Sequence, residues 1–261
     1  MSQLRSKLVV TGFFALLAAL VALAIVYSRK PEVDSATGCV LDVSGRPLTV
    51  ILLDQSDEFE AGDVARAKSL AIGILRSLAT DEKIVAIEIN PTKPYEPSIL
   101  FDRCAPKRQS EWSIFFDNVR SLKVRQDEFE SAFRDTTEAA FSRRELPASP
   151  IIETLAYVTR RVDFSSASDR RLFLFSDLIQ NYGQLNFYRR VPAGDDVTEE
   201  SLRIESVSMA NTIVTPILVA RRQHWTKRPN LRAFWSRWLE SRGAFVNWKA
   251  SEGDAAEIVA R

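Results

Sequence analysis

Histidine, cysteine and methionine are scarce in this chain of 261 residues, which contains one His, two Cys and two Met. The single histidine, His224, leaves almost no material for a triad with a histidine base or for a zinc site. It stands in a basic loop after a predicted strand, where we expect a surface side chain. The chain also lacks a G-x-x-x-x-G-K phosphate loop, a Rossmann glycine fingerprint and a G-x-S-x-G elbow. The sequence therefore carries none of the common signatures of nucleotide-binding proteins or serine hydrolases.

An excess of charge of one sign is missing as well. Lys and Arg number 35 against 34 for Asp and Glu, which gives a formal net charge of +1. Such a balance exerts no overall pull on nucleic acid or on an anionic surface, so any charge-driven binding has to be local. The stretch 221–242 mixes arginines with Trp225, Trp235 and Trp238, a composition that can bind nucleic acid or lipid. Trp235 and Trp238 share the apolar stripe of a predicted helix, however, so we expect them in the core and expect no nucleic-acid partner.

Only one long uncharged apolar run is present, from Leu8 to Tyr27. As a helix with a rise of 1.5 Å per residue it spans about 30 Å, the thickness of a bilayer's hydrocarbon core. We expect a transmembrane anchor there, preceded by a short tail at 1–7 and followed by a polar tether at 28–38. The alternative is a cleaved signal peptide, because Ala22-Leu23-Ala24 has the small-x-small form of a cleavage site. Signal cores are usually shorter, about 7 to 15 residues, which favours an uncleaved anchor.

The two cysteines, Cys39 and Cys104, have neither a C-x-x-C spacing nor histidine partners. This pattern favours one disulfide in an oxidising compartment over a metal or redox site. Basic residues flank the anchor almost equally, so the positive-inside rule does not decide its orientation. The cysteine pair then favours a single-pass protein of a bacterial-type envelope, with its domain outside the cytoplasm. Two unrelated buried thiols in a cytoplasmic domain remain the alternative.

Strand and helix patterns alternate along residues 39–261. The predicted strands are 48–53, 83–89, 98–101, 171–176 and 211–220, with a further short edge strand at 39–43. The predicted helices are 62–78, 112–119, 126–141, 151–161 and 229–242. This order predicts an α/β fold with a doubly wound, mostly parallel sheet in a three-layer sandwich. Pro216 indicates an edge or bulged strand, and we expect the insertion 181–208 to be a surface loop of limited order.

Polar side chains follow two of the buried strands. The stretch LTVILLDQSDE ends in Asp54-x-Ser56-x-Glu58, and RLFLFSD ends in Asp177. Ser149 opens a later helix as its expected N-cap. Because the carboxyl ends of parallel strands meet at one edge of a sheet, these residues are expected to lie together.

This spacing resembles the metal-ion-dependent adhesion site of the von Willebrand factor A domain. That motif reads D-x-S-x-S, then a threonine, then an aspartate; here Glu58 takes the third position and Ser149 the threonine's place, so the motif is degenerate. The resemblance implies an A-like fold in which Mg²⁺ or Mn²⁺ is held by Asp54, Ser56, Glu58, Ser149 and Asp177. In that family the carboxylate of a partner protein completes the metal's shell. The resemblance thus implies a membrane-anchored binding module or scaffold rather than an enzyme.

Two other functions remain open. The acids can stand at a helix N-terminus without any metal, in a structural subunit of a membrane complex. A metal-dependent hydrolase is a third possibility, in which a bound metal activates water. A phosphotransferase of the haloacid dehalogenase type would need an aspartate where Ser56 stands. Metal dependence of partner binding separates the first two functions, and phosphoester turnover lost on Asp54→Ala would identify the third.

Overall fold

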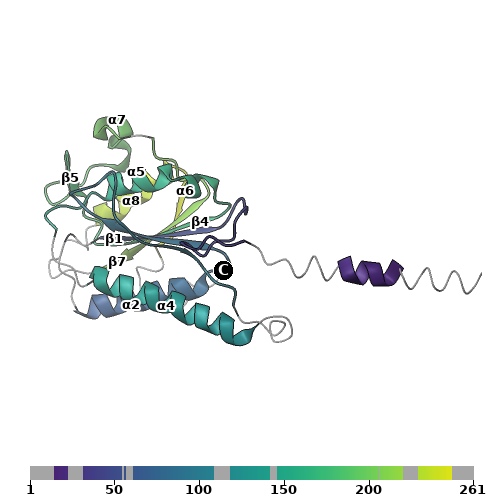
Figure 1. Ribbon diagram of the computed structural model, residues 1–261. Coiled ribbons are helices and arrows are strands. Elements are labelled where there is room, and N and C mark those ends of the chain that lie inside the picture. Colours follow the sequence, from purple (N-terminus) through teal and green to yellow (C-terminus); the bar gives the residue numbers. More distant parts are fainter. Residues whose placement is uncertain are drawn as a thin grey trace, which may run out of the picture.

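A six-stranded sheet between two layers of helices forms the body of the protein (Figure 1). The structure is a computed structural model that describes residues 15–22, 32–54, 56, 61–108, 118–141, 146–204, 206–219 and 229–248. The strands lie in the order β3 (Ile99–Cys104), β2 (Lys83–Ile89), β1 (Leu48–Asp54), β4 (Arg170–Ser176), β7 (Thr212–Leu218) and β8 (Ala244–Val246). Only β3 is antiparallel to its neighbour. The predicted doubly wound, mostly parallel α/β fold is confirmed.

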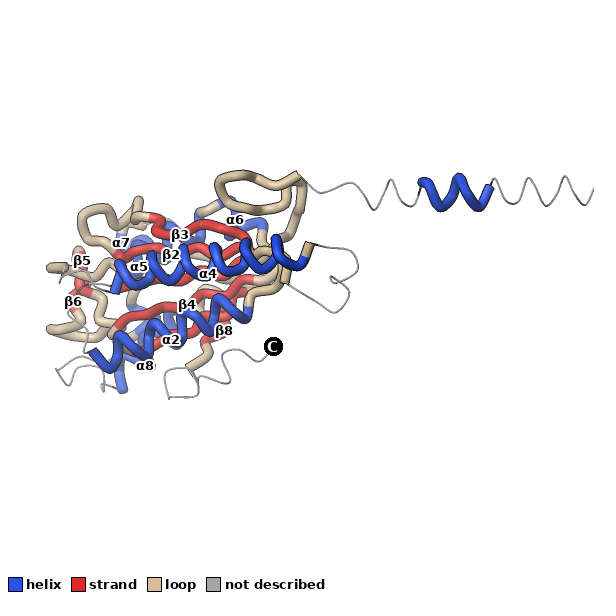
Figure 2. Tube along the Cα trace, turned by 60° about the horizontal axis from the view of Figure 1, so that its bottom comes forward, coloured by secondary structure: helices blue, strands red, loops and turns tan. Residues whose placement is uncertain are grey.

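Helices cover both faces of the sheet, which explains why the central strands are apolar without alternation. All seven residues of β1 are buried. Val50 and Leu52 point into one core cluster, and Ile51 and Leu53 into the other. The first cluster is covered by α5 (Ile151–Arg160), α6 (Val162–Ser166) and α8 (Pro229–Glu240), and the second by α2 (Ala61–Ser77) and α4 (Val119–Phe141). Figures 1 and 2 show these two helical layers on opposite sides of the sheet.

Several element boundaries differ from the sequence prediction. Helix α4 begins at Val119 rather than at residue 126, and the rest of the predicted helix 112–119 lies outside the described residues. Strand β3 continues to Cys104, beyond the predicted end at 101. The expected edge strand at 39–43 is reduced to one bridge between Val33 and Val40. Helix α6 and strand β8 were not predicted, because both are too short to show a period.

The insertion 181–208 is not the loop of limited order that its polar composition indicates. It contains the hairpin β5 (Asn181–Tyr182) and β6 (Leu185–Asn186), the 3₁₀ turn η1 (Gly194–Asp196) and helix α7 (Glu199–Leu202). Phe187 is buried and packs edge-on against Phe234 of α8, with ring centroids 4.7 Å apart. At Gly194 a Cβ atom would lie 2.7 Å from Cβ of Arg237, so only glycine allows this close approach to α8. The insertion is therefore an ordered cover over one face of the core.

Pro216 was expected to mark an edge or bulged strand, yet β7 lies between β4 and β8. The prediction is wrong for the first half of β7, which has neighbours on both sides. It agrees with the second half, which is an edge on the side of β8. Strand β8 pairs with Thr212 to Val214 only, and the last bond on that side is from the amide of Asn247 to the carbonyl of Val214. Pro216 pairs with Leu174 on the other side and lies beyond the reach of β8. A residue without an amide donor is tolerated there.

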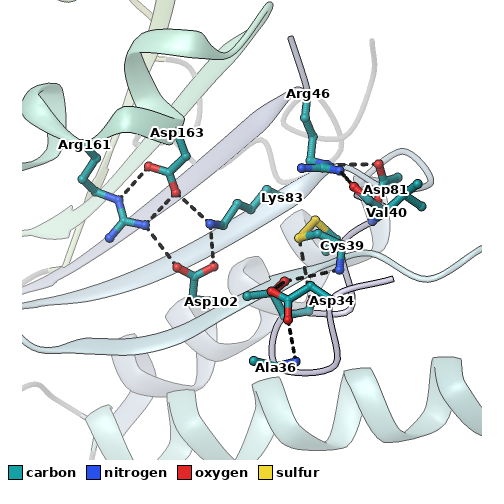
Figure 3. The surroundings of a disulfide bond; sticks show 12 residues. Asp34, Ala36, Cys39, Val40, Arg46, Asp81, Lys83, Asp102, Arg161 and Asp163 are labelled. Atoms are coloured by element: carbon teal, nitrogen blue, oxygen red, sulfur yellow. Dashed lines mark hydrogen bonds and ion pairs between the residues drawn. A yellow bond between two sulfur atoms is a disulfide. The ribbon is translucent and has the colours of Figure 1, made fainter. Parts of the chain in front are cut away.

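The end of the sheet at which β1, β2 and β4 begin is called the basal end below. Cys39 and Cys104 form a disulfide there, with their Cα atoms 4.9 Å apart, and the predicted pairing is confirmed. Figure 3 shows an ion-pair cluster beside it. Lys83 bonds to Asp102 and Asp163 at 2.9 and 2.8 Å, and Arg161 bonds to the same two carboxylates at 3.1 and 2.6 Å. This cluster ties the junction of α5 and α6 to β2 and β3.

The predicted anchor falls largely outside the described residues. Of the run from Leu8 to Tyr27 the structure describes residues 15–22, which are helical and exposed. Across the described part of the chain, no helix has both the length and the apolar character needed to cross a membrane.

Candidate functional site at the crest of the sheet

Asp54 is the hub of a polar cluster at the end of the sheet opposite the basal end, which we call the crest. It ends β1 and is almost fully buried, at 2% exposure. Its Oδ1 accepts a hydrogen bond from the amide of Ser56 at 3.0 Å. Its Oδ2 accepts two more, from the hydroxyls of Ser149 at 2.8 Å and Ser176 at 2.6 Å. One carboxylate thus accepts one backbone and two side-chain hydrogen bonds, and it joins three separate segments of the chain.

Ser149 reaches this cluster through the backbone rather than as a helix cap. It exchanges two backbone hydrogen bonds with Asn181, at 3.0 and 3.1 Å. The predicted N-cap role is wrong: Pro150 occupies the cap position of α5, and no side chain caps there. The Oε1 atom of Gln180 accepts from the amide of Ile152 at 3.0 Å instead. With its amide paired in the bridge, the hydroxyl of Ser149 faces Asp54.

Asp177 follows β4, the strand next to β1, and is completely buried. Burial first, and then the charge of Asp54, raise the pKa of Asp177 well above its ordinary value, although the amide of Ile179 donates to its Oδ1 at 3.0 Å. The next residue, Leu178, has a φ of 65°. Its carbonyl accepts a hydrogen bond from the indole of Trp235 at 2.8 Å. Helix α8 therefore fixes the backbone turn that directs Asp177 into the crest.

A pocket of about 390 Å³ opens beside these carboxylates. Its polar lining comes from Ser56, Ser149, Asn181 and Tyr188, and its apolar lining from residues 146–148. Burial and the charges of Asp177 and Asp54 raise the pKa of Tyr188 to about 12, so its phenol stays protonated at neutral pH. The ordered insertion supplies Asn181 and Tyr188, and so forms one wall of the pocket.

The crest residues fit a hard divalent cation. Mg²⁺ binds carboxylate and hydroxyl oxygens, and Mn²⁺ accepts the same ligands. The hydroxyl of Ser149 donates its hydrogen to Asp54, which leaves the lone pairs of its oxygen available to a cation. A divalent cation would also relieve the repulsion between Asp54 and Asp177. Within the described ranges, no group of three or more His, Cys, Asp or Glu residues forms a metal site. The described oxygen donors beside Asp54 are the hydroxyls of Ser149 and Ser176.

The structure brings together four of the five residues that the sequence singled out for a metal. These are Asp54, Ser56, Ser149 and Asp177, whereas Glu58 lies outside the described residues. Ser176 and Tyr188 were missed. Ser176 had a visible signal, since it is a hydroxyl residue at the end of an otherwise apolar strand run beside Asp177. Tyr188 had none, because its place depends on how the insertion folds.

A further buried acid, besides Asp54 and Asp177, lies next to the crest in the first turn of α5. Glu153 is 3% exposed and accepts a hydrogen bond from Nε2 of Gln180 at 2.9 Å. Burial raises the pKa of Glu153 above its ordinary value, and the bond from Gln180 offsets only part of that effect. Oε1 of the same Gln180 side chain accepts from the amide of Ile152, so one side-chain amide links this acid to the first turn of α5.

A scan against protein-family models gives no match, and a search of curated proteins gives none either. Among solved structures, the chain is similar to an aerotolerance-related membrane protein from Bacteroides fragilis, with 14% identity, 81% of this chain and 96% of that chain covered, and a TM-score of 0.40. It is similar to a von Willebrand factor type A protein from Catenulispora acidiphila, with 12% identity, 83% and 42% covered, and a TM-score of 0.47. It is also similar to BatB from Bacteroides thetaiotaomicron, with 12% identity, 82% and 95% covered, and a TM-score of 0.43. At these identities the likeness is one of fold, and a von Willebrand A protein is among the similar structures, as the sequence predicted.

Proposed function

We propose that this protein is a membrane-anchored, von Willebrand A-like binding module that recruits another protein through its crest. The observation that carries the proposal is the convergence of Ser149 and Ser176 on Asp54, one strand away from the buried Asp177. Three segments of the chain hold these oxygens in place, whereas a helix cap or an ordinary core contact needs only one such segment. Such an arrangement suits a prepared binding site.

A divalent Mg²⁺ or Mn²⁺ bound at this cluster would supply an open coordination position for the carboxylate of a partner protein. Asp54, Ser56, Ser149 and Asp177 are the described residues that would hold it. The protonated phenol of Tyr188 lines the same pocket and is placed to donate a hydrogen bond to an incoming acceptor. Binding rather than catalysis is proposed, because these residues offer ligands and donors around the pocket and His224 is the chain's only histidine.

The anchored arrangement is supported by the apolar run Leu8–Tyr27 and by the position of residues 32–47. These residues lead into β1 and lie at the basal end, next to the disulfide (Figures 1 and 3). A domain held at that end presents its crest away from the bilayer, toward other proteins. The disulfide supports an oxidising compartment outside the cytoplasm.

Thermal unfolding of the full chain in detergent tests the metal site. The parent protein is compared in chelator and in excess Mg²⁺ or Mn²⁺, beside Asp177→Asn and the exposed control Asp169→Asn. A ligand at one hundred times its Kd stabilises by about 2.7 kcal/mol, or roughly 5 to 10 °C in a domain of this size. We expect that rise in the parent and in Asp169→Asn, and its loss in Asp177→Asn.

A short peptide with one aspartate tests partner recognition, with the same peptide carrying asparagine as its control. Binding of the aspartate peptide only in the presence of metal supports the module. If no metal raises the melting temperature of the parent, the function moves to the alternative, a metal-free structural subunit of a membrane complex. That alternative is supported by the ordered insertion, which packs on α8 and forms a defined surface for a partner without a metal.

A further inference from the structure

Exposed apolar side chains gather at the basal end of the domain. Val33, Leu41 and Val43 lie in the segment that leads into β1, and each is about half exposed. Val162, at the first position of α6, is 82% exposed. Helix α6 lies at this end, because the side chain of Arg170, the first residue of β4, donates to the carbonyl of Phe164 at 2.6 Å. Apolar groups are thus left in contact with solvent where the chain enters the domain.

Basic side chains form a second sector of the same end. The described residues 103–108 and 118–125 contain six exposed basic side chains and no acidic one: Arg103, Lys107, Arg108, Arg120, Lys123 and Arg125. Val124, among them on α4, is 48% exposed. The whole chain has a net charge of only +1, so this local excess stands out.

The start of α4 lies at the basal end because α4 runs antiparallel to α2. Lys68 pairs with Glu138, and Arg76, near the end of α2, pairs with Glu130. The residues of α4 before Glu130 therefore lie beyond the end of α2, which leads to the first residue of β2. Arg108 lies at the same end of α2, since its guanidinium donates to the carbonyl of Leu75 at 3.4 Å. Figures 1 and 2 both show α4 extending past the sheet on the side where the N-terminal segment leaves the domain.

Acidic groups also lie at the basal end, and those of the entry segment are separate in sequence from the basic sector. Glu32, Asp34 and Asp42 belong to the entry segment, beside its exposed valines and leucine. Hydrogen bonds from the hydroxyl of Thr37 and the amide of Ala36 lower the pKa of Asp34, so this acid stays charged. Asp127 and Glu128, also exposed, follow the basic residues further along α4. The basal end thus has an acidic and apolar entry segment and a basic sector that is confined to residues 103–108 and the first two turns of α4.

We propose that the basic sector at 103–108 and 118–125 docks on anionic phospholipid headgroups, so that the domain lies against the bilayer rather than swinging freely from it. This rests on the anchor in the proposed function. Val33 follows Tyr27 by six residues, which reach at most about 20 Å when extended. The disulfide joins the entry segment to the end of β3, next to Arg103. The short tether therefore holds the basic sector near the headgroups. There each Lys or Arg increases the binding constant for an anionic surface about fivefold.

Hydrogen exchange of the full chain in nanodiscs tests the docking. One set of discs contains phosphatidylcholine alone, and the other includes one third phosphatidylglycerol. We expect the amides of 119–125 to exchange at least about fivefold more slowly in the anionic discs, and this protection to vanish at high salt. The triple variant Arg120→Glu, Lys123→Glu, Arg125→Glu should lose it. Acids in the first turns of a helix are favourable, so this variant is expected to fold.

The matched control carries the same charge change at the crest, in Lys93→Glu, Arg189→Glu, Arg190→Glu, and should keep the protection. Equal exchange in the two kinds of disc, with the chain firmly incorporated, overturns the docking and leaves the anchored module intact. Protection that depends on lipid but is equal in both triple variants overturns the assignment to the basic sector. A chain that does not enter the discs overturns the anchor and the docking together. Metal-dependent melting at the crest reports on the binding module independently of all these outcomes.

Discussion

The hydroxyl of Ser149 donates a hydrogen bond of 2.8 Å to Oδ2 of Asp54 across 95 positions of sequence. Both groups are buried, and Ser176 donates to the same oxygen. This contact joins the segment before α5 to the end of β1. Since Ser149 also bridges to Asn181, it connects the core of the crest to the wall of the pocket as well. Ser149 is therefore the residue through which the pocket and the carboxylates are held in one geometry.

Replacement of Ser149 by alanine should destabilise the protein by about 1 to 3 kcal/mol, because a buried carboxylate oxygen loses a donor. Urea unfolding monitored by tryptophan fluorescence measures the loss. Ser149→Thr keeps the hydroxyl and should retain most of the stability. The control Ser168→Ala removes an exposed hydroxyl that donates to the carboxylate of its neighbour Asp169 and should cost little. Equal stabilities of the Ala and Thr variants at position 149 would show that the hydroxyl does not hold the crest.

The ion-pair cluster at the basal end predicts a loss of stability in acid. Although burial acts to raise the pKa of Asp163, Arg161 and Lys83 lower it to about 2, from an ordinary value of 3.8. A carboxylate whose pKa is lower in the folded protein than in the unfolded chain stabilises the fold at pH values above its unfolded pKa. This contribution is lost as the pH falls from about 5 toward 2. Partial exposure reduces it to roughly 1 to 2 kcal/mol. Asp163→Asn should lose that amount at pH 7 and show a flatter acid limb, which urea titrations at several pH values would detect.

Glu153 predicts the opposite dependence. Burial raises its pKa, so the folded state favours the protonated acid and stability falls as the pH rises through the folded pKa. Glu153→Gln keeps an oxygen that can accept from Gln180 and carries no charge. We expect its melting temperature to exceed that of the parent at pH 8 and to approach it at pH 4. A change of 1 kcal/mol corresponds to roughly 2 to 4 °C here. An unchanged difference between pH 4 and pH 8 would mean that Glu153 does not titrate in this range.

The sequence predicts the sheet well, because its strands leave strong local signals. Both ends of strand β2 are predicted as observed, and those of β1 and β4 to within one residue. Each of these strands is an apolar run bounded by polar residues. The buried stripe of α8, with Trp235 and Trp238, is confirmed for the same reason. Short elements without a period, such as α6 and β8, could not be predicted.

The site could be predicted only in part, because its second half is set by tertiary contacts. Asp54 and Asp177 follow apolar strands, and their places come from the parallel order of the sheet alone. The orientation of Ser149 depends on a bridge to Asn181, and that of Tyr188 on the packing of Phe187 against α8. The acidic run near residue 195 made the insertion look solvated, whereas its sparse apolar residues decide how it folds. Local composition therefore predicted the carboxylates but not the wall beside them.

The disulfide between Cys39 and Cys104 should be the largest single contribution to stability at the basal end. It closes a loop of 65 residues, and the chain-entropy treatment gives about 4 kcal/mol for a loop of this length. We expect Cys39→Ala with Cys104→Ala to lower the free energy of unfolding by that order, measured by urea unfolding without reductant. Reductant should bring the parent to the level of the variant and leave the variant unchanged. The cluster of Lys83, Asp102, Arg161 and Asp163 lies beside the disulfide, so a variant as stable as the parent would show that these ion pairs hold the basal end by themselves.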